Sequence, residues 1–208
     1  MRARRCSHSE TSPKHQSLKC LLRIFSQAAG YSSGEKGIAP GNLSKKTKLA
    51  AADALAFVSV AKYPPVGERS WGPTRAMTLA GMSDMKAYLR EANALTVTFA
   101  MIETQTAIDN LDAIASTEGI DALFVGPSDL SIALTDGSEV EPHSALVERE
   151  LDRVVAAAGK HNKVPGLYCA NAERAVFAAK RGFRFLAVGS DLGFLRMGTA
   201  AQLKALKG

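Results

Sequence analysis

Short apolar runs alternate with amphipathic segments along most of this chain. The apolar runs have the length of strands buried on both faces, and the amphipathic segments repeat their apolar residues at helical spacing. This alternation predicts an α/β protein with parallel strands, either a sheet covered by helices on both faces or a closed barrel. The predicted strands are 95–102, 122–125, 164–168 and 183–188, and the helices expected after them are 104–116, 144–161, 172–181 and 192–206.

Two further helices are predicted before the first strand. Residues 49–61 are rich in Ala and Leu, and the pattern stops at Pro64 and Pro65, which cannot continue a helix. A loop punctuated by Gly and Pro follows over 66–75, and 82–92 is the second helix candidate.

Composition divides the chain near residue 48. Residues 1–48 are dominated by Ser, Lys, Gly and Pro, with one short amphipathic stretch at 18–29, and we expect a basic, disordered leader. Residues 49–208 form the expected folded domain. The net charge of +6 follows this division, because residues 1–49 hold 10 Lys or Arg and 2 Asp or Glu. The rest of the chain is slightly acidic, so the charge does not indicate a nucleic-acid-binding protein.

The chain has three cysteines, Cys6, Cys20 and Cys169, which are odd in number and widely spaced. They predict neither a disulfide framework nor a zinc site, and a reducing, cytoplasmic location is expected. Cys169 has no basic partner nearby in the sequence and is expected to be an inert buried thiol. No segment approaches the ~20 apolar residues that a membrane-spanning helix needs, so we expect no membrane partner.

Two acidic residues are the main candidates for chemistry. Glu103 closes the apolar run of one predicted strand, and Asp129 follows the next strand in the sequence Gly-Pro-Ser-Asp-Leu. Reactive groups of parallel α/β sheets lie where strands end, and two carboxylates there make a site for a hard divalent cation. A second interpretation stays open, in which Ser128 and Asp129 cap a helix and Glu103 is a solvated rim residue.

Other polar residues are weaker candidates. Arg69, Trp71 and Arg75 lie in the Gly/Pro-rich loop, where a role in anion binding or as a lid competes with a solvated or subunit-contact role. His143 and His161 lie near the two ends of a predicted helix and are expected at the surface.

Four segments in order along the chain carry motifs of a known family, at residues 62–72, 102–114, 119–131 and 187–191. Together they resemble the HpcH/HpaI aldolases, a family of 2-oxo-acid class II aldolases that includes macrophomate synthase-like members. Residues 62–72, KYPPVGERSWG, resemble the family's Tyr-Pro-Pro-x-Gly-x-Arg loop, and 102–114 resemble its metal-ligand strand and following helix. Residues 119–131, GIDALFVGPSDLS, are similar to its most diagnostic block, and 187–191 to its last strand and turn. The likeness covers about residues 50–208.

The resemblance implies a (β/α)8 TIM barrel, here its C-terminal half, and a homohexamer that exchanges C-terminal helices. It implies metal-dependent cleavage or formation of a carbon–carbon bond of a 4-hydroxy-2-oxo acid, with a 2-oxo acid and an aldehyde as small-molecule partners. Glu103 and Asp129 match the ligands of Mg²⁺, Mn²⁺ or Co²⁺, and the amides of Ser128 and Asp129 match those that hold the pyruvate carboxylate. The reaction would pass through a pyruvate enolate.

Two departures from the family pattern concern catalysis. Met101 stands where many members have a substrate-contacting Gln. The family's Asp-x-Glu-His segment with the catalytic base, and its catalytic Arg, have no match in residues 1–49, so the catalytic residues are left unassigned. An alternative expectation is therefore a catalytically impaired fragment that keeps metal binding or associates with full-length subunits.

Overall fold

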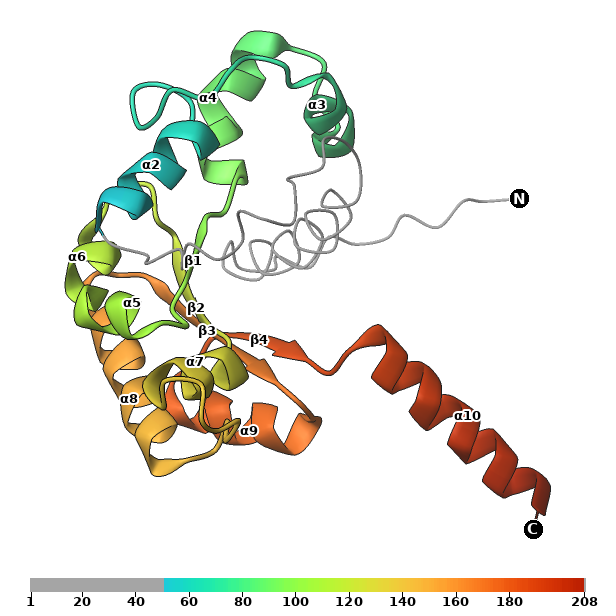
Figure 1. Cartoon of the computed structure of the whole chain (residues 1–208). Coiled ribbons are helices and arrows are strands. Elements are labelled where there is room, and N and C mark those ends of the chain that lie inside the picture. The colour runs from blue at the N-terminus through green and yellow to red at the C-terminus, as the bar shows by residue number, and fades with distance from the viewer. Residues whose placement is uncertain (1–50, 208) are drawn as a thin grey trace, which may run out of the picture. The chain divides into compact units, whose positions relative to one another are not determined.

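The computed structural model describes residues 51–207 of the chain, which belong to one compact unit, Thr47–Gly208. The predicted leader, including the amphipathic stretch at 18–29, lies outside the described residues. Three helices come first, and strands and helices then alternate to the end (Figure 1). The elements are α2 (Ala51–Ala61), α3 (Thr74–Ala80), α4 (Met85–Leu95), β1 (Phe99–Met101), α5 (Gln105–Asp109), α6 (Leu111–Ser116), β2 (Ala122–Val125), α7 (Pro127–Leu134), α8 (Ala145–Lys160), β3 (Val164–Cys169), α9 (Ala172–Arg181), β4 (Phe185–Val188) and α10 (Asp191–Lys207).

The described strands form one parallel sheet in the order β1-β2-β3-β4, which is also their order in the chain. Crossovers between parallel strands are right-handed, so a sheet whose order never reverses places every crossover helix on the same face. Figure 1 shows α5 to α9 together on one side of the sheet. Of the two arrangements that the sequence left open, this one is the barrel type, because helices on both faces require a reversal of strand order.

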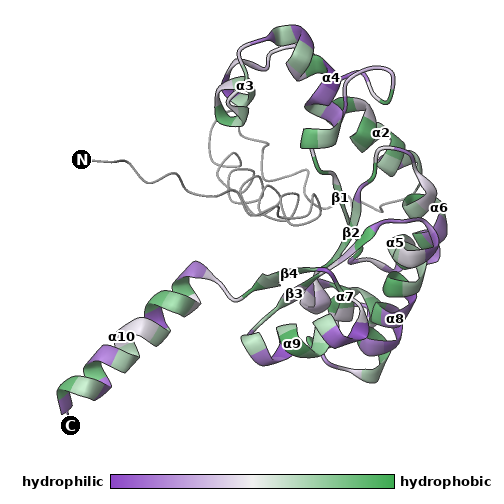
Figure 2. Ribbon diagram, turned by 180° about the vertical axis from the view of Figure 1, so that it is seen from behind, coloured by the Kyte–Doolittle hydropathy of each residue, from purple (hydrophilic) through white to green (hydrophobic). Residues whose placement is uncertain are grey.

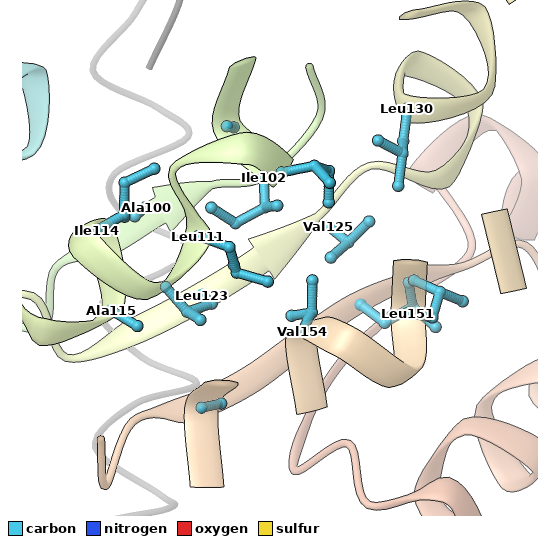
Figure 3. Packing of buried hydrophobic residues seen from close by; sticks show 14 of the residues in the cluster. Ala100, Ile102, Leu111, Ile114, Ala115, Leu123, Val125, Leu130, Leu151 and Val154 are labelled. Atoms are coloured by element: carbon cyan, nitrogen blue, oxygen red, sulfur yellow. The ribbon is translucent and has the colours of Figure 1, made fainter. Parts of the chain in front are cut away.

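The core lies between the sheet and these helices. Figure 3 shows Leu123 and Val125 of β2 pointing toward Leu111 of α6 and toward Leu151 and Val154 of α8. All of these side chains are buried, and burial of each contributes about 1.5–3 kcal/mol. In Figure 2 the strands are mostly green, whereas α8 and α9 carry both green and purple turns, as amphipathic helices should.

Three phenylalanine rings meet on the other face of the sheet. Phe99, Phe124 and Phe185 come from β1, β2 and β4, with ring centroids 4.7–6.3 Å apart. Gly166 of β3 pairs with both Phe124 and Phe185, so it lies beneath the rings. A Cβ atom at Gly166 would lie 2.8 Å from Phe124 Cδ2, and this close approach explains the glycine.

Several predicted elements are confirmed with small shifts in their ends. Strand β2 and helix α9 have the predicted bounds, and Gly182 ends α9 in the left-handed conformation with φ 111°. Strand β1 is shorter than the predicted 95–102, because α4 continues to Leu95 and Thr96 is its C-cap.

Two predictions about helices were wrong. The single helix predicted over 104–116 is divided into α5 and α6 at Asn110, whose Nδ2 donates a hydrogen bond back to Thr106 O. Asn side chains compete in this way with the helical backbone pattern. Helix α3, which begins within the predicted loop, was missed because a helix of 7 residues carries too few apolar repeats to be recognised.

Candidate active site at the carboxyl ends of the strands

Glu103 is held between a sheet residue and a helix cap. Ile102 is fully buried, and its N–H donates to Phe124 O at 2.8 Å, so the ladder between β1 and β2 continues one residue beyond β1. Thr104 Oγ1 accepts from Ala107 N at 3.1 Å and caps α5. The backbone of Glu103 is therefore fixed on both sides, and its side chain is half-buried at the strand end.

Asp129 lies in the first turn of α7, and the same helix corrects the predicted cap. Helix α7 begins two residues earlier than an N-cap at Ser128 would place it, with Gly126 as N-cap, Pro127 in the first turn and no side-chain cap hydrogen bond. The prediction that Ser128 is the N-cap was wrong, because proline is favoured at the first helical position and starts the helix there. Buried Leu130 anchors the turn, and Asp129 stays exposed.

The two acidic side chains converge over Gly126. The register of β1 and β2, extended by two residues, places Glu103 opposite Gly126. A Cβ atom at Gly126 would lie 3.1 Å from Glu103 Oε2 and 3.1 Å from Asp129 Oδ2. The two oxygens are therefore no further apart than twice that distance, as expected if both belong to one site.

The electrostatics of the pair agree with this closeness. The pKa of Glu103 is raised above its ordinary value, first because partial burial penalises the carboxylate and second because the charge of Asp129 repels it. A cation between the two oxygens would offset both effects. Perturbed carboxyl groups of this kind are typical of functional sites.

The donor set fits a small divalent cation. Mg²⁺ is usually bound through one or two carboxylates, with water and substrate oxygens completing its coordination. The two carboxylate oxygens are the nearest atoms to the position that a Cβ atom at Gly126 would take, and Asp129 is exposed to solvent. Among the residues that the structure describes, no group of three or more His, Cys, Asp or Glu side chains is arranged to hold a metal ion. The pair thus suits a cation that takes its remaining ligands from water and substrate, rather than a zinc site made of protein ligands alone.

Two backbone amides adjoin the acidic pair. The first N–H groups of a helix have no intrahelical acceptor, and Pro127 has no N–H to offer. Ser128 and Asp129 therefore supply the first free donors of α7. Such donors at a helix N-terminus favour an anion, so groups suited to a cation and to a carboxylate are joined in one turn.

The other sequence candidates lie elsewhere or are engaged. His161 ends α8 just before β3, at the opposite edge of the sheet, with its ring 2.8 Å from Asp112. His143 is exposed, as predicted. Cys169 is fully buried, and burial raises the pKa of its thiol, although Arg174 lowers it to a smaller extent. The charge of Arg174 corrects the expectation that Cys169 has no basic neighbour.

The Gly/Pro-rich loop forms an aromatic cluster. Arg69 lies over the Tyr63 ring at 5.1 Å, and Trp71 contacts Tyr63 and Tyr88 with ring centroids 5.4 and 6.3 Å away. Trp71 is nevertheless 46% exposed. These contacts show how the loop is held against α4, and the anion-binding or lid role stays a prediction.

Sequence reasoning missed an ion pair between a buried lysine and a partly exposed aspartate at the other edge of the sheet. Lys62 Nζ donates to Asp121 Oδ2 at 2.7 Å, and the lysine side chain is 3% exposed. The same carboxylate oxygen accepts from Thr98 N at 2.8 Å. Asp121 immediately precedes β2, so it lies at the amino ends of the strands, and its position before the apolar run was the available signal.

Known proteins resemble this chain over most of its length. Residues 46–197 match the family model of the HpcH/HpaI aldolase/citrate lyase group. The chain belongs to this family. The HpcH/HpaI chain is 36% identical over 158 residues to a 5-keto-4-deoxy-D-glucarate aldolase of Klebsiella pneumoniae, which covers 76% of the chain and 60% of that relative. It is 39% identical over 143 residues to a 4-hydroxy-2-oxovalerate aldolase of Novosphingobium aromaticivorans, covering 68% of the chain and 52% of the relative.

Solved structures give the same assignment. An HpcH/HpaI aldolase of Desulfitobacterium hafniense superposes with a TM-score of 0.66 at 30% identity, covering 76% of this chain and 60% of that one. The chain thus spans 52–60% of the length of these relatives, and the part that it matches is part of a TIM barrel. The matching part of the barrel is the parallel sheet, whose strands follow chain order and whose crossover helices lie on one face.

Proposed function

We propose that this chain carries the metal and 2-oxo-acid site of a pyruvate-type aldolase that cleaves or forms the C3–C4 bond of a 4-hydroxy-2-oxo acid. The observation that supports it is the convergence of Glu103 Oε2 and Asp129 Oδ2 over Gly126, at the edge of the sheet where α/β enzymes bind substrate. Relatives named as aldolases for 5-keto-4-deoxy-D-glucarate and 4-hydroxy-2-oxovalerate indicate the substrate class.

Each group of the site has a proposed role. Glu103 and Asp129 hold Mg²⁺, Mn²⁺ or Co²⁺, and the amides of Ser128 and Asp129 orient the substrate carboxylate. The bound cation would draw electron density from the keto oxygen and stabilise the enolate that bond cleavage leaves. The fixed backbone on both sides of Glu103 sets the point from which its side chain extends toward Gly126.

Catalytic power depends on groups that have no assignment in this chain. General acid–base catalysis typically contributes 10²–10⁴-fold. His161 lies at the edge of the sheet opposite to the acidic pair, so it does not serve as the base of this site. A second candidate function follows, in which the chain keeps metal binding but turns over substrate slowly or acts in association with full-length subunits.

Self-association is part of the proposal. Helix α10 has no buried residue, and it exposes apolar side chains that a single chain leaves in water, including Leu195 at 68% and Met197 at 69% exposure. In Figures 1 and 2 α10 extends beyond β4, away from the helices that cover the sheet. An exposed apolar surface of this kind suits contact with another subunit, as in a homo-oligomer.

No helix within residues 51–207 is long and apolar enough to cross a membrane.

Calorimetric titration with Mn²⁺ tests the metal site. Glu103→Ala and Asp129→Ala should each weaken binding at least tenfold, because each removes one of two charged ligands. Glu118→Ala is the matched control, since this exposed carboxylate precedes β2 at the other edge of the sheet. Equal Mn²⁺ affinity in all four proteins would refute the assignment.

A lyase assay separates the two candidate functions. Pyruvate release from a 4-hydroxy-2-oxo acid in the presence of Mn²⁺ supports the aldolase. Manganese binding that depends on Glu103 and Asp129, without pyruvate release above buffer, supports the metal-binding chain that lacks turnover.

A further inference from the structure

Gly126 is not required by its backbone conformation. Its φ of −93° and ψ of 98° lie in the extended region, which every L-residue adopts without strain. Glycine is a weaker N-cap than Ser, Asp or Asn, so helix capping does not select it either. The reason for this glycine must lie in what surrounds it.

Space is what the glycine provides. A Cβ atom there would meet Asp129 Oδ2 and Glu103 Oε2 at 3.1 Å each, and Asp129 Cβ at 3.9 Å. Both carboxylate oxygens therefore lie on the side of Gly126 where other residues carry their Cβ atom. Carbon–oxygen contacts of 3.1 Å are tighter than van der Waals packing, so a methyl group would push the two oxygens away from each other or from the glycine.

We propose that Gly126 is a positioning residue of the site, whose missing side chain keeps open the gap that a divalent cation occupies between Glu103 and Asp129. A cation bound to both oxygens lies about 2.0–2.6 Å from each. The methyl group of an alanine at this position would lie 3.1 Å from the same two oxygens, so it would compete with the cation for space. The inference rests on the proposed function, because it assumes that these two carboxylates bind the metal.

Two substitutions separate the gap from the helix cap. Gly126→Ala adds the methyl group and also weakens the cap, whereas Gly126→Ser adds a Cβ but supplies a preferred N-cap residue. If the gap matters, both variants lose Mn²⁺ affinity, and only the alanine variant loses thermal stability. A merely structural role would predict that serine restores Mn²⁺ binding together with stability.

The experiment is calorimetric titration of the full chain with Mn²⁺, alongside thermal unfolding in EDTA. We expect the dissociation constant to rise at least tenfold in Gly126→Ala and in Gly126→Ser. The matched control is Gly159→Ala, since a Cβ atom at this glycine of α8 meets nothing within 4 Å and should leave Mn²⁺ affinity within twofold of wild type.

The outcomes distinguish the two proposals. If wild type binds Mn²⁺ through Glu103 and Asp129 but both Gly126 variants bind it equally well, the inference on Gly126 is overturned and the proposed function stands. If wild type binds no Mn²⁺, or binds it independently of the two carboxylates, both are overturned.

Discussion

Replacing Lys62 by methionine should destabilise the protein far more than the same change at Lys160. Both lysines form an ion pair with an aspartate, and the Nζ to carboxylate oxygen distance is 2.7 Å in each. The pairs differ in burial, because the Lys62 side chain is 3% exposed and that of Lys160 is 64% exposed. The comparison therefore tests burial together with the additional acceptors that the buried Lys62 ammonium satisfies.

The magnitude follows from the groups that Lys62 satisfies. Its ammonium also donates to the carbonyl oxygens of Asn93, at 2.9 Å, and Thr96. Methionine fills the space of the aliphatic stem but offers no donor. Asp121 is 40% exposed and keeps its hydrogen bond from Thr98 N. Water and Thr98 therefore compensate this carboxylate for the missing ammonium group. A fully buried acceptor left without a partner costs about 1–3 kcal/mol. The two carbonyls are only partly buried, so we expect a total in the lower half of the summed range, about 3 kcal/mol.

Urea unfolding measures the difference directly. The signal is the fluorescence of Trp71, the single tryptophan of the chain, whose ring contacts the neighbour of Lys62, Tyr63. A loss of about 3 kcal/mol lowers the melting temperature by roughly 6–12 °C in a domain of this size. Lys160→Met should leave the free energy of unfolding nearly unchanged, since exposed ion pairs contribute little. Equal losses in the two variants would show that burial of the Lys62 ammonium does not set its contribution.

Two further predictions concern the acidic pair and the face of the sheet that carries the rings of Phe99, Phe124 and Phe185. Gly166→Ala should cost about 1–3 kcal/mol in urea unfolding, because the added methyl group lies 2.8 Å from the Phe124 ring and overpacks this face; unchanged stability would contradict the packing. The folded pKa of Glu103 is raised, so its contribution to the stability of the metal-free protein is highest below the ordinary pKa of 4.5 and is lost as pH rises through the folded value. In EDTA, the melting temperature of Glu103→Gln should therefore rise relative to that of wild type as the pH increases above 4.5. A difference that stays constant with pH would argue against a carboxylate destabilised by burial and by Asp129.

The candidate site could be predicted in part because its residues follow strand ends. Glu103 and Asp129 come directly after apolar runs, and the carboxyl ends of parallel strands share one edge. The closeness of their oxygens could not be predicted, since it depends on the register that puts Glu103 opposite Gly126. The prediction that Ser128 is the N-cap was wrong for a local reason, because Pro127 already starts the helix.

The sequence by itself determined the types of most elements and, to within a few residues, their bounds. Apolar runs and helical spacing are local patterns, and stops such as Gly182 act on their own neighbours, so α9 and β2 are found where the pattern places them. Only the tertiary structure decided that the strand order never reverses, which puts the crossover helices on one face and makes the sheet part of a barrel. It also joined Lys62 to Asp121, 59 residues later. Such contacts depend on how distant segments pack, and no periodicity along the chain records them.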